Sequence, residues 1–179
     1  MKFSISQNGV VISSVYFNDN TIKEIVTFWT NVQYQSPQFA LDLSPKTSSQ
    51  LDQLYPNGLI PNISTGQAAT IEVLTDSPLL QNIYIVEMQL IFVGIPDSSN
   101  SWSDHFDTAT WAITPAGTAF LSPVEANSSS ITITPLATQD PLDVSYKALV
   151  SFQIANDPDH TYFAIIDPLA KITTSTGSS

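Results

Sequence analysis

The feature that most constrains this chain is a run of alternating apolar and polar residues near its C-terminal end. Between Val144 and Ile154 every even position is apolar, and polar residues hold the odd positions except at Leu149. Because a β-strand turns successive side chains to opposite faces, this period of two predicts a half-buried strand. The turn sequence at 156–159 and a further run from Thr161 predict that residues 144–172 form a hairpin.

A second strand is predicted over residues 83–95, where apolar side chains dominate. One face is uninterrupted and consists of Tyr84, Val86, Met88, Leu90 and Phe92. The other face mixes three isoleucines with one glutamate and one glutamine. This pattern predicts a central strand that is buried on the first face and partly covered on the second.

Shorter alternating runs occupy residues 10–17, 69–74, 108–113 and 130–134, and clusters of Pro, Gly, Asn and Ser separate them. Many short strands with such punctuation are typical of sandwiches and barrels. The predicted fold is an all-β antiparallel β-sandwich, immunoglobulin-like or jelly-roll-like, with at most one or two short helical turns.

Two patterns overlap between Thr21 and Tyr34. Apolar positions 22, 25, 26 and 29 fit one face of a helix, whereas positions 26, 28 and 32 also fit a strand. The β-branched and aromatic content of the segment favours a strand, which is the prediction made.

The length of 179 residues predicts one domain, spanning 1–174. Residues 44–67 hold several prolines and glycines and are predicted to form a long connection, in which 48–54 could form a helical turn. The small polar residues at 175–179 are predicted to be a disordered tail.

The charge of the chain disfavours several classes of partner. The chain has 16 acidic and 5 basic residues, all of the basic ones lysine, and a net charge of −11. Nucleic acid and anionic membranes are therefore predicted to be poor partners.

The N-terminus lacks the apolar core of a signal peptide, and the longest apolar stretch is shorter than the roughly 20 residues of a membrane span. A cytoplasmic protein without membrane insertion is predicted, with non-classical export as the alternative.

Catalytic signatures are scarce. The chain has no cysteine, only two histidines, no G-x-S-x-G motif and no glycine-rich phosphate loop. The prediction is therefore a non-enzyme without a cofactor. A carboxylate-dependent glycoside hydrolase remains the alternative, with Glu87, whose partial burial in an apolar strand would raise its pKa, as the best interior acid.

The segment 100–107 combines aromatic, acidic, amide and imidazole side chains after a polar turn. An exposed tryptophan can stack on a sugar ring while carboxylate and amide groups bind its hydroxyls. Asn100, Trp102, Asp104 and His105 are therefore the predicted ligand-binding residues of a carbohydrate site. In the alternative interpretation, Trp102 or Phe106 plugs the core beneath the loop.

A second acidic cluster lies at the tip of the closing hairpin. Asp157 and Asp159 could begin a calcium site, although a complete site needs oxygens from other loops. The sequence Asn-Asp-Pro-Asp is also typical of a turn, which requires no metal.

Low charge density supports a further role. Charged residues make up 12% of the chain, against roughly 25% in ordinary soluble domains. Such a surface opposes packing of copies only weakly, so self-association through a β-edge or an apolar patch is predicted. The leading hypothesis is a self-associating structural protein, and the lectin-like module and the hydrolase follow it.

The closing hairpin, with its Asp167-Pro168 step, resembles the end of bacterial inclusion-body proteins of the PixA/AidA type. In that family an aromatic strand likewise reaches an Asp-Pro step before one last alternating strand. The resemblance covers residues 144–172, while the family's acidic opening strand and Trp-Arg segment have no counterpart here. It implies a β-sandwich that accumulates in bacterial cells as inclusions, with no catalytic residues to carry over.

Overall fold

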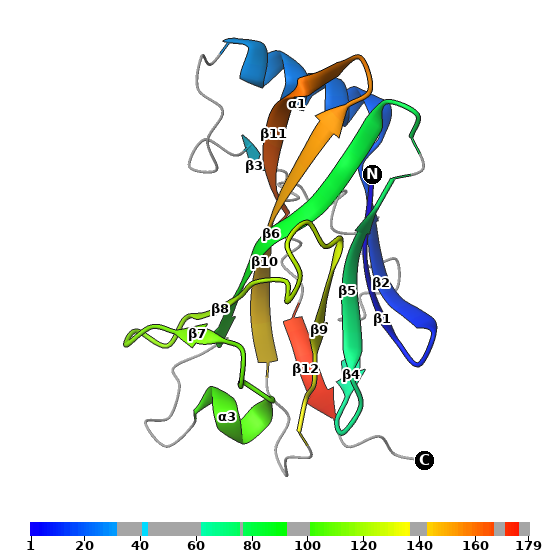
Figure 1. The fold of residues 1–179 in the computed structure, drawn as a ribbon. Helices are drawn as coiled ribbons and strands as arrows, with labels where there is room; N and C mark the ends of the chain where they lie inside the picture. Colours follow the sequence, from blue (N-terminus) through cyan, green and yellow to red (C-terminus); the bar gives the residue numbers. More distant parts are fainter. Residues whose placement is uncertain are drawn as a thin grey trace.

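The computed structural model describes residues 1–31, 41–42, 62–75, 77–92, 101–136, 143–166 and 171–175. Two β-sheets pack face to face around one apolar core, so the predicted all-β sandwich is confirmed (Figure 1). The smaller sheet has the order β2-β1-β5-β9 and is antiparallel throughout. Its strands are β1 (Lys2–Gln7), β2 (Val10–Tyr16), β5 (Ala69–Leu74) and β9 (Ser130–Ile133).

The larger sheet has eight strands, of which six follow the order β3-β11-β10-β6-β8-β7. The remaining two, β12 and β4, extend it from β10. The short strand β3 pairs in parallel with β11, and the short strand β4 pairs in parallel with β12. The other described pairings in this sheet are antiparallel. The strands are β3 (Leu41–Asp42), β4 (Asn62–Ser64), β6 (Leu80–Phe92), β7 (Ala112–Ile113), β8 (Ala119–Leu121), β10 (Asp143–Ile154), β11 (Asp157–Ile166) and β12 (Lys171–Ser175).

The predicted C-terminal hairpin is confirmed as β10 and β11. Its even-numbered residues from Val144 to Phe152 are all buried, as the alternation predicts. The turn is shorter than expected, because β11 already begins at Asp157. The last strand, β12, pairs with the other end of β10, where Val144 faces Ile172. It extends to Ser175, the first residue of the predicted tail.

The central strand β6 is present, but its predicted buried face is wrong over its first half. Ile85 is buried and Val86 is exposed, whereas Met88 and Leu90 are buried farther along. The reason is a β-bulge: Glu87 faces Leu149 and Ile85 faces the next residue of β10, so Val86 is an extra residue. Since one inserted residue exchanges the two faces of a strand, a strict period of two fails across it.

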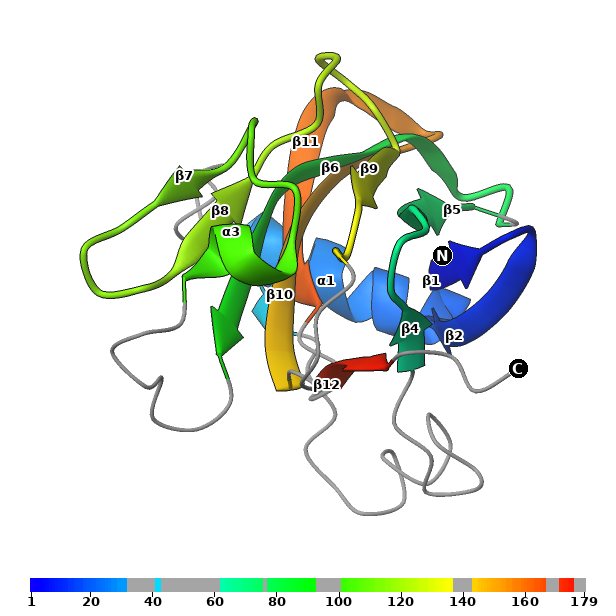
Figure 2. The same ribbon diagram turned by 90° about the horizontal axis from the view of Figure 1, so that it is seen from below.

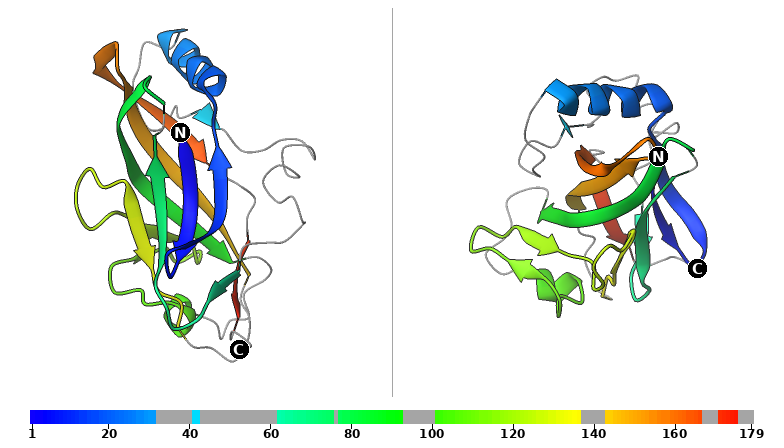
Figure 3. Two further views of the ribbon diagram at one scale, coloured as in Figure 1. Left: turned by 90° about the vertical axis from the view of Figure 1, so that its right-hand side faces the viewer. Right: turned by 45° about the horizontal axis from the view of Figure 1, so that its top comes forward.

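The segment predicted as a strand near Thr21 is instead the helix α1 (Asp19–Asn31). Its start is capped by Asn18, whose side-chain oxygen accepts hydrogen bonds from the backbone of Asn20 and Thr21 at 3.0 and 3.1 Å. Ile22 and Ile25, three residues apart, are buried. At 13 residues, α1 is longer than the predicted helical turns, and it lies across one end of the sandwich (Figure 3).

Four strands, β1, β3, β4 and β8, lie where none was predicted. Serines flank the buried residues Phe3 and Ile5 of β1, so the strand has little apolar pattern in the sequence, although Ser4 is itself buried. The short β4 falls inside the predicted connection and is held by Gln7, whose side-chain oxygen accepts a hydrogen bond from the backbone of Ser64 at 2.9 Å. The predicted helical turn at 48–54 lies outside the described residues. Neither described helix has the length and apolar character needed to cross a membrane.

Candidate functional site

The predicted carbohydrate segment folds into a single helical turn, α3 (Trp102–His105), beside the hairpin of β7 and β8 (Figure 2). Asp104 holds this turn in place, because its carboxylate accepts hydrogen bonds from the backbone N–H and the hydroxyl of Ser101 at 2.9 and 3.0 Å. The backbone hydrogen bond from Ser101 lowers the pKa of Asp104. Asp104 therefore serves the start of α3, and its carboxylate faces solvent.

Trp102 points into the core and is only 2% exposed. Its indole N–H donates to the carbonyl of Gly117 at 2.8 Å, which ties α3 to the β7–β8 turn. Its ring lies 5.9 Å from that of Phe106. The arrangement is the core plug that the sequence left open as an alternative, and a sugar cannot stack on this ring. His105 is also buried, at 7% exposure, and Asn100 lies outside the described residues.

A second tryptophan, Trp111, is less buried than Trp102. It precedes β7 and is half-buried, with its ring 5.3 Å from Phe106 and 5.8 Å from Trp102. A backbone hydrogen bond from Trp111 to the Thr108 carbonyl, at 3.0 Å, fixes the turn before it. Trp111 thus packs against two aromatic rings and keeps part of its side chain accessible. Sequence reasoning placed it only in a strand, because the spacing of the two tryptophans does not reveal which of them is covered.

Trp111 lines a hollow of about 320 Å³. The opposite wall is the connection 122–129, which runs from β8 in one sheet to β9 in the other. Both sheets hold this connection: Val73 of β5 donates to the Ser129 carbonyl at 2.8 Å, and Ile85 of β6 donates to that of Ser128 at 3.0 Å. The hydrogen bond from Ile85 lies next to the β-bulge at Val86, so this bulged part of β6 holds the connection in place.

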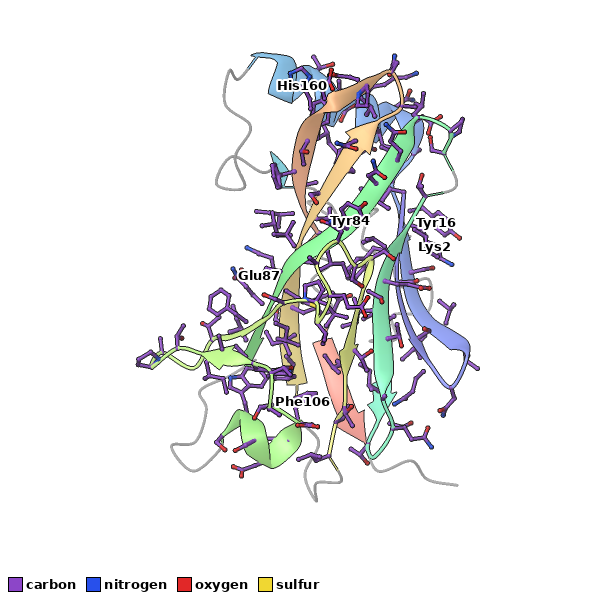
Figure 4. All side chains as sticks on the ribbon, in the orientation of Figure 1. Lys2, Tyr16, Tyr84, Glu87, Phe106 and His160 are labelled. Carbon is purple, nitrogen blue, oxygen red and sulfur yellow. The ribbon has the colours of Figure 1, made fainter. Side chains whose placement is uncertain are left out.

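A second hollow, of about 300 Å³, lies on the other side of the same connection. Tyr84 and Val86 of β6 line it, and Glu125 lines both hollows. Tyr84 stands in the middle of the large sheet, close to where β9 passes (Figure 4). The connection is therefore a ridge that carries a carboxylate, with one aromatic side chain on each side.

The paired carboxylates of a glycoside hydrolase are not assembled in these hollows. A third hollow, of about 660 Å³ near the start of α1, contains Asp19, and each of the three is lined by a single carboxylate from the described residues. Glu87 is half-buried on the outward face of β6, opposite Leu149 (Figure 4). Nothing in the described part of the chain gives a positive sign of catalysis.

One of the two candidate calcium residues, Asp157, takes part in a hydrogen-bonded brace at the tip of the β10–β11 hairpin. One carboxylate oxygen of Asp157 lies 2.5 Å from His160 Nδ1, and the other accepts from the Tyr162 hydroxyl at 2.6 Å. Asp159 is exposed. Over the described ranges, no three His, Cys, Asp or Glu side chains gather in a way that could hold a metal ion. The brace lies within β11 and joins its first residue, Asp157, to Tyr162, which is buried.

This brace predicts a pH-dependent stability. The hydrogen bond from Tyr162 lowers the pKa of Asp157 below its ordinary 3.8, while burial raises the pKa of Tyr162 to about 12. A lowered carboxyl pKa means that folding favours the ionised form, so its stabilisation is present above pH 3.8 and is lost as the pH falls through the lowered value. We expect Asp157→Asn to melt at a lower temperature than the wild type near pH 6, and this gap to close in acid.

Thermal unfolding followed by circular dichroism from pH 6 to pH 2 measures this gap. Asp159→Asn is the matched control, because it removes a neighbouring exposed carboxylate that lies outside the brace. An equal loss in the two variants, or a gap that persists at pH 2, would contradict the role of the brace.

The fold defines this chain as an all-β sandwich protein. No family model, curated protein or solved structure matches it. The resemblance of the closing hairpin to the inclusion-body family therefore stays a hypothesis, and the functional argument rests on the geometry of the chain itself.

Proposed function

We propose that the protein is a non-enzymatic structural β-sandwich that associates with copies of itself through the edge strand β2. The observation that carries this proposal is the position and composition of that strand. In the order β2-β1-β5-β9, β2 is an end strand, and among the described residues it pairs only with β1. Its sequence, VVISSVY, contains no charge, proline or glycine. Natural edge strands often carry charged residues or proline, because these block pairing with another chain.

The exposed side chains of β2 support the same role. Val10, Val11 and Tyr16 are 64%, 49% and 64% exposed. A β-bulge interrupts the strand at Ile12, since Ser13 faces Ile5 while Val11 faces the next residue of β1. The regular run from Ser13 to Tyr16 remains for pairing with a second strand, whose hydrogen bonds would satisfy the outer backbone groups.

The charge distribution supports a second copy as the partner. Residues 1–18 contain Lys2 and no acidic residue, so all 16 acidic residues of the chain lie beyond this hairpin. Lys2 Nζ lies 5.6 Å from the ring centre of Tyr16, at one end of the edge (Figure 4). Two copies with a net charge of −11 each repel one another, and a hairpin without acidic residues of its own reduces that repulsion where two β2 strands would meet. The same proposal includes accumulation in the cytoplasm, as the inclusion-body resemblance implies.

Sedimentation velocity over a range of protein and salt concentrations tests the proposal. We expect the wild type to form oligomers whose fraction increases with salt, because screening weakens the repulsion between acidic copies. Val11→Lys places a charge on the edge and should weaken association at least tenfold. Leu74→Lys is the matched control, since Leu74 is an exposed residue of the interior strand β5. A wild type that stays monomeric throughout, or equal association of the two variants, would refute β2 pairing.

A further inference from the structure

We infer that the two hollows beside the connection 122–129 bind an uncharged oligosaccharide, with Trp111 as the stacking platform. This site differs from the one predicted around Trp102, whose ring is buried. It is also independent of the β2 edge, because β9, which lines the first hollow, is the opposite end strand of the small sheet.

The platform is rigid before any ligand arrives. Trp111 packs against Phe106 and Trp102 at ring distances of 5.3 and 5.8 Å. Trp102 is in turn fixed by its hydrogen bond to Gly117. An aromatic ring held in this way offers a flat apolar surface with little loss of side-chain entropy on binding, and the apolar face of a sugar ring fits such a surface.

Polar side chains at the rim of the first hollow are available to bind sugar hydroxyls. Thr110, Ser122, Glu125 and Thr132 are exposed around the first hollow and can donate to or accept from sugar hydroxyls. Specific small-molecule sites combine apolar walls with a few such polar groups.

The charge of the site selects among sugars. The described residues that line the two hollows include one carboxylate, Glu125, and no lysine or histidine. A carboxylate accepts hydrogen bonds from hydroxyls but repels another anion, and the net charge of −11 adds to that repulsion. The site therefore fits a neutral sugar and excludes uronates and sulfated sugars.

The second hollow extends the site beyond one ring. Its volume of about 300 Å³ is close to the 320 Å³ of the first, and Tyr84 supplies an aromatic side chain there. Glu125 lines both hollows from the ridge between them. A chain of sugars that crosses this ridge would contact Trp111 with one unit and Tyr84 with another, so an oligomer should bind more tightly than a monosaccharide.

The experiment is a glycan array with labelled full-length protein, carrying neutral hexose and N-acetylhexosamine oligomers together with uronate oligomers. The strongest neutral oligomer is then titrated by calorimetry. We expect wild-type binding to neutral oligomers only, and a loss of affinity of at least tenfold in both Trp111→Ala and Glu125→Gln. Glu24→Gln, which removes an exposed carboxylate on α1, is the matched control and should bind as the wild type does.

Glu125→Gln keeps the test valid if Trp111→Ala disturbs the aromatic cluster, because Glu125 is an exposed loop residue. Wild-type affinity in Glu125→Gln overturns the site, whatever Trp111→Ala does. An empty array, or binding of uronates in preference to neutral sugars, overturns it as well.

Discussion

Trp102→Ala is expected to lower the free energy of unfolding by about 3–5 kcal/mol, the usual cost of truncating a large buried aromatic residue. The side chain is 2% exposed, packs against Phe106 and Trp111, and donates to Gly117. Its removal leaves a cavity beneath α3 and releases the β7–β8 turn. Urea denaturation measures the loss, which is a large share of the roughly 5–15 kcal/mol that stabilises a typical domain.

Trp111→Ala is the comparison for this variant. Trp111 belongs to the same cluster but is half-buried, so its truncation should cost less. The two variants should therefore differ in what they change: Trp102→Ala should cause the larger loss of stability, whereas Trp111→Ala should chiefly lower the affinity for sugar. If Trp102→Ala changed stability by less than about 0.5 kcal/mol, as substitutions of isolated surface residues do, the plug assignment would be wrong.

Glu24→Pro is expected to destabilise the protein by about 3 kcal/mol or more. Glu24 is an exposed residue in the interior of α1, where proline removes a backbone donor and its ring clashes with the carbonyl four residues earlier. Disruption of the helix would also withdraw Ile22 and Ile25 from the core. Urea denaturation with detection by circular dichroism measures both the loss of stability and any loss of helix.

Glu24→Ala controls for the loss of the carboxylate. Alanine favours helices, and position 24 is exposed, so stability should stay nearly unchanged. A proline variant as stable as the alanine variant would contradict the helix.

The β10–β11 hairpin was predictable because its physical cause is local. Alternation from Val144 to Phe152 places every apolar residue except Leu149 on one face, and the native sheet buries that face. The face of β6 was predictable only in part. The bulge at Val86 depends on the register with β10 and on the bond from Ile85 to Ser128, and neither contact can be read from the strand's own sequence.

The error at α1 has a similar origin. Ile22 and Ile25 fit both a helix and a strand in sequence, and intrinsic β-propensity favoured the strand. The helix forms because Asn18 caps its start and because the end of the sandwich receives its apolar face. Tertiary packing outweighs propensities that differ by less than about 1 kcal/mol per residue.

For this protein, the sequence alone determined the all-β class, because period-two patterning and turn residues act within a few positions of one another. It also determined the acidic charge and the uncharged composition of β2. Only the tertiary structure decided that β2 lies at a sheet edge, that Trp102 is covered and that Trp111 borders a hollow. Exposure and proximity depend on contacts between segments far apart in the chain, so the residues of a site are assembled only when the two sheets pack.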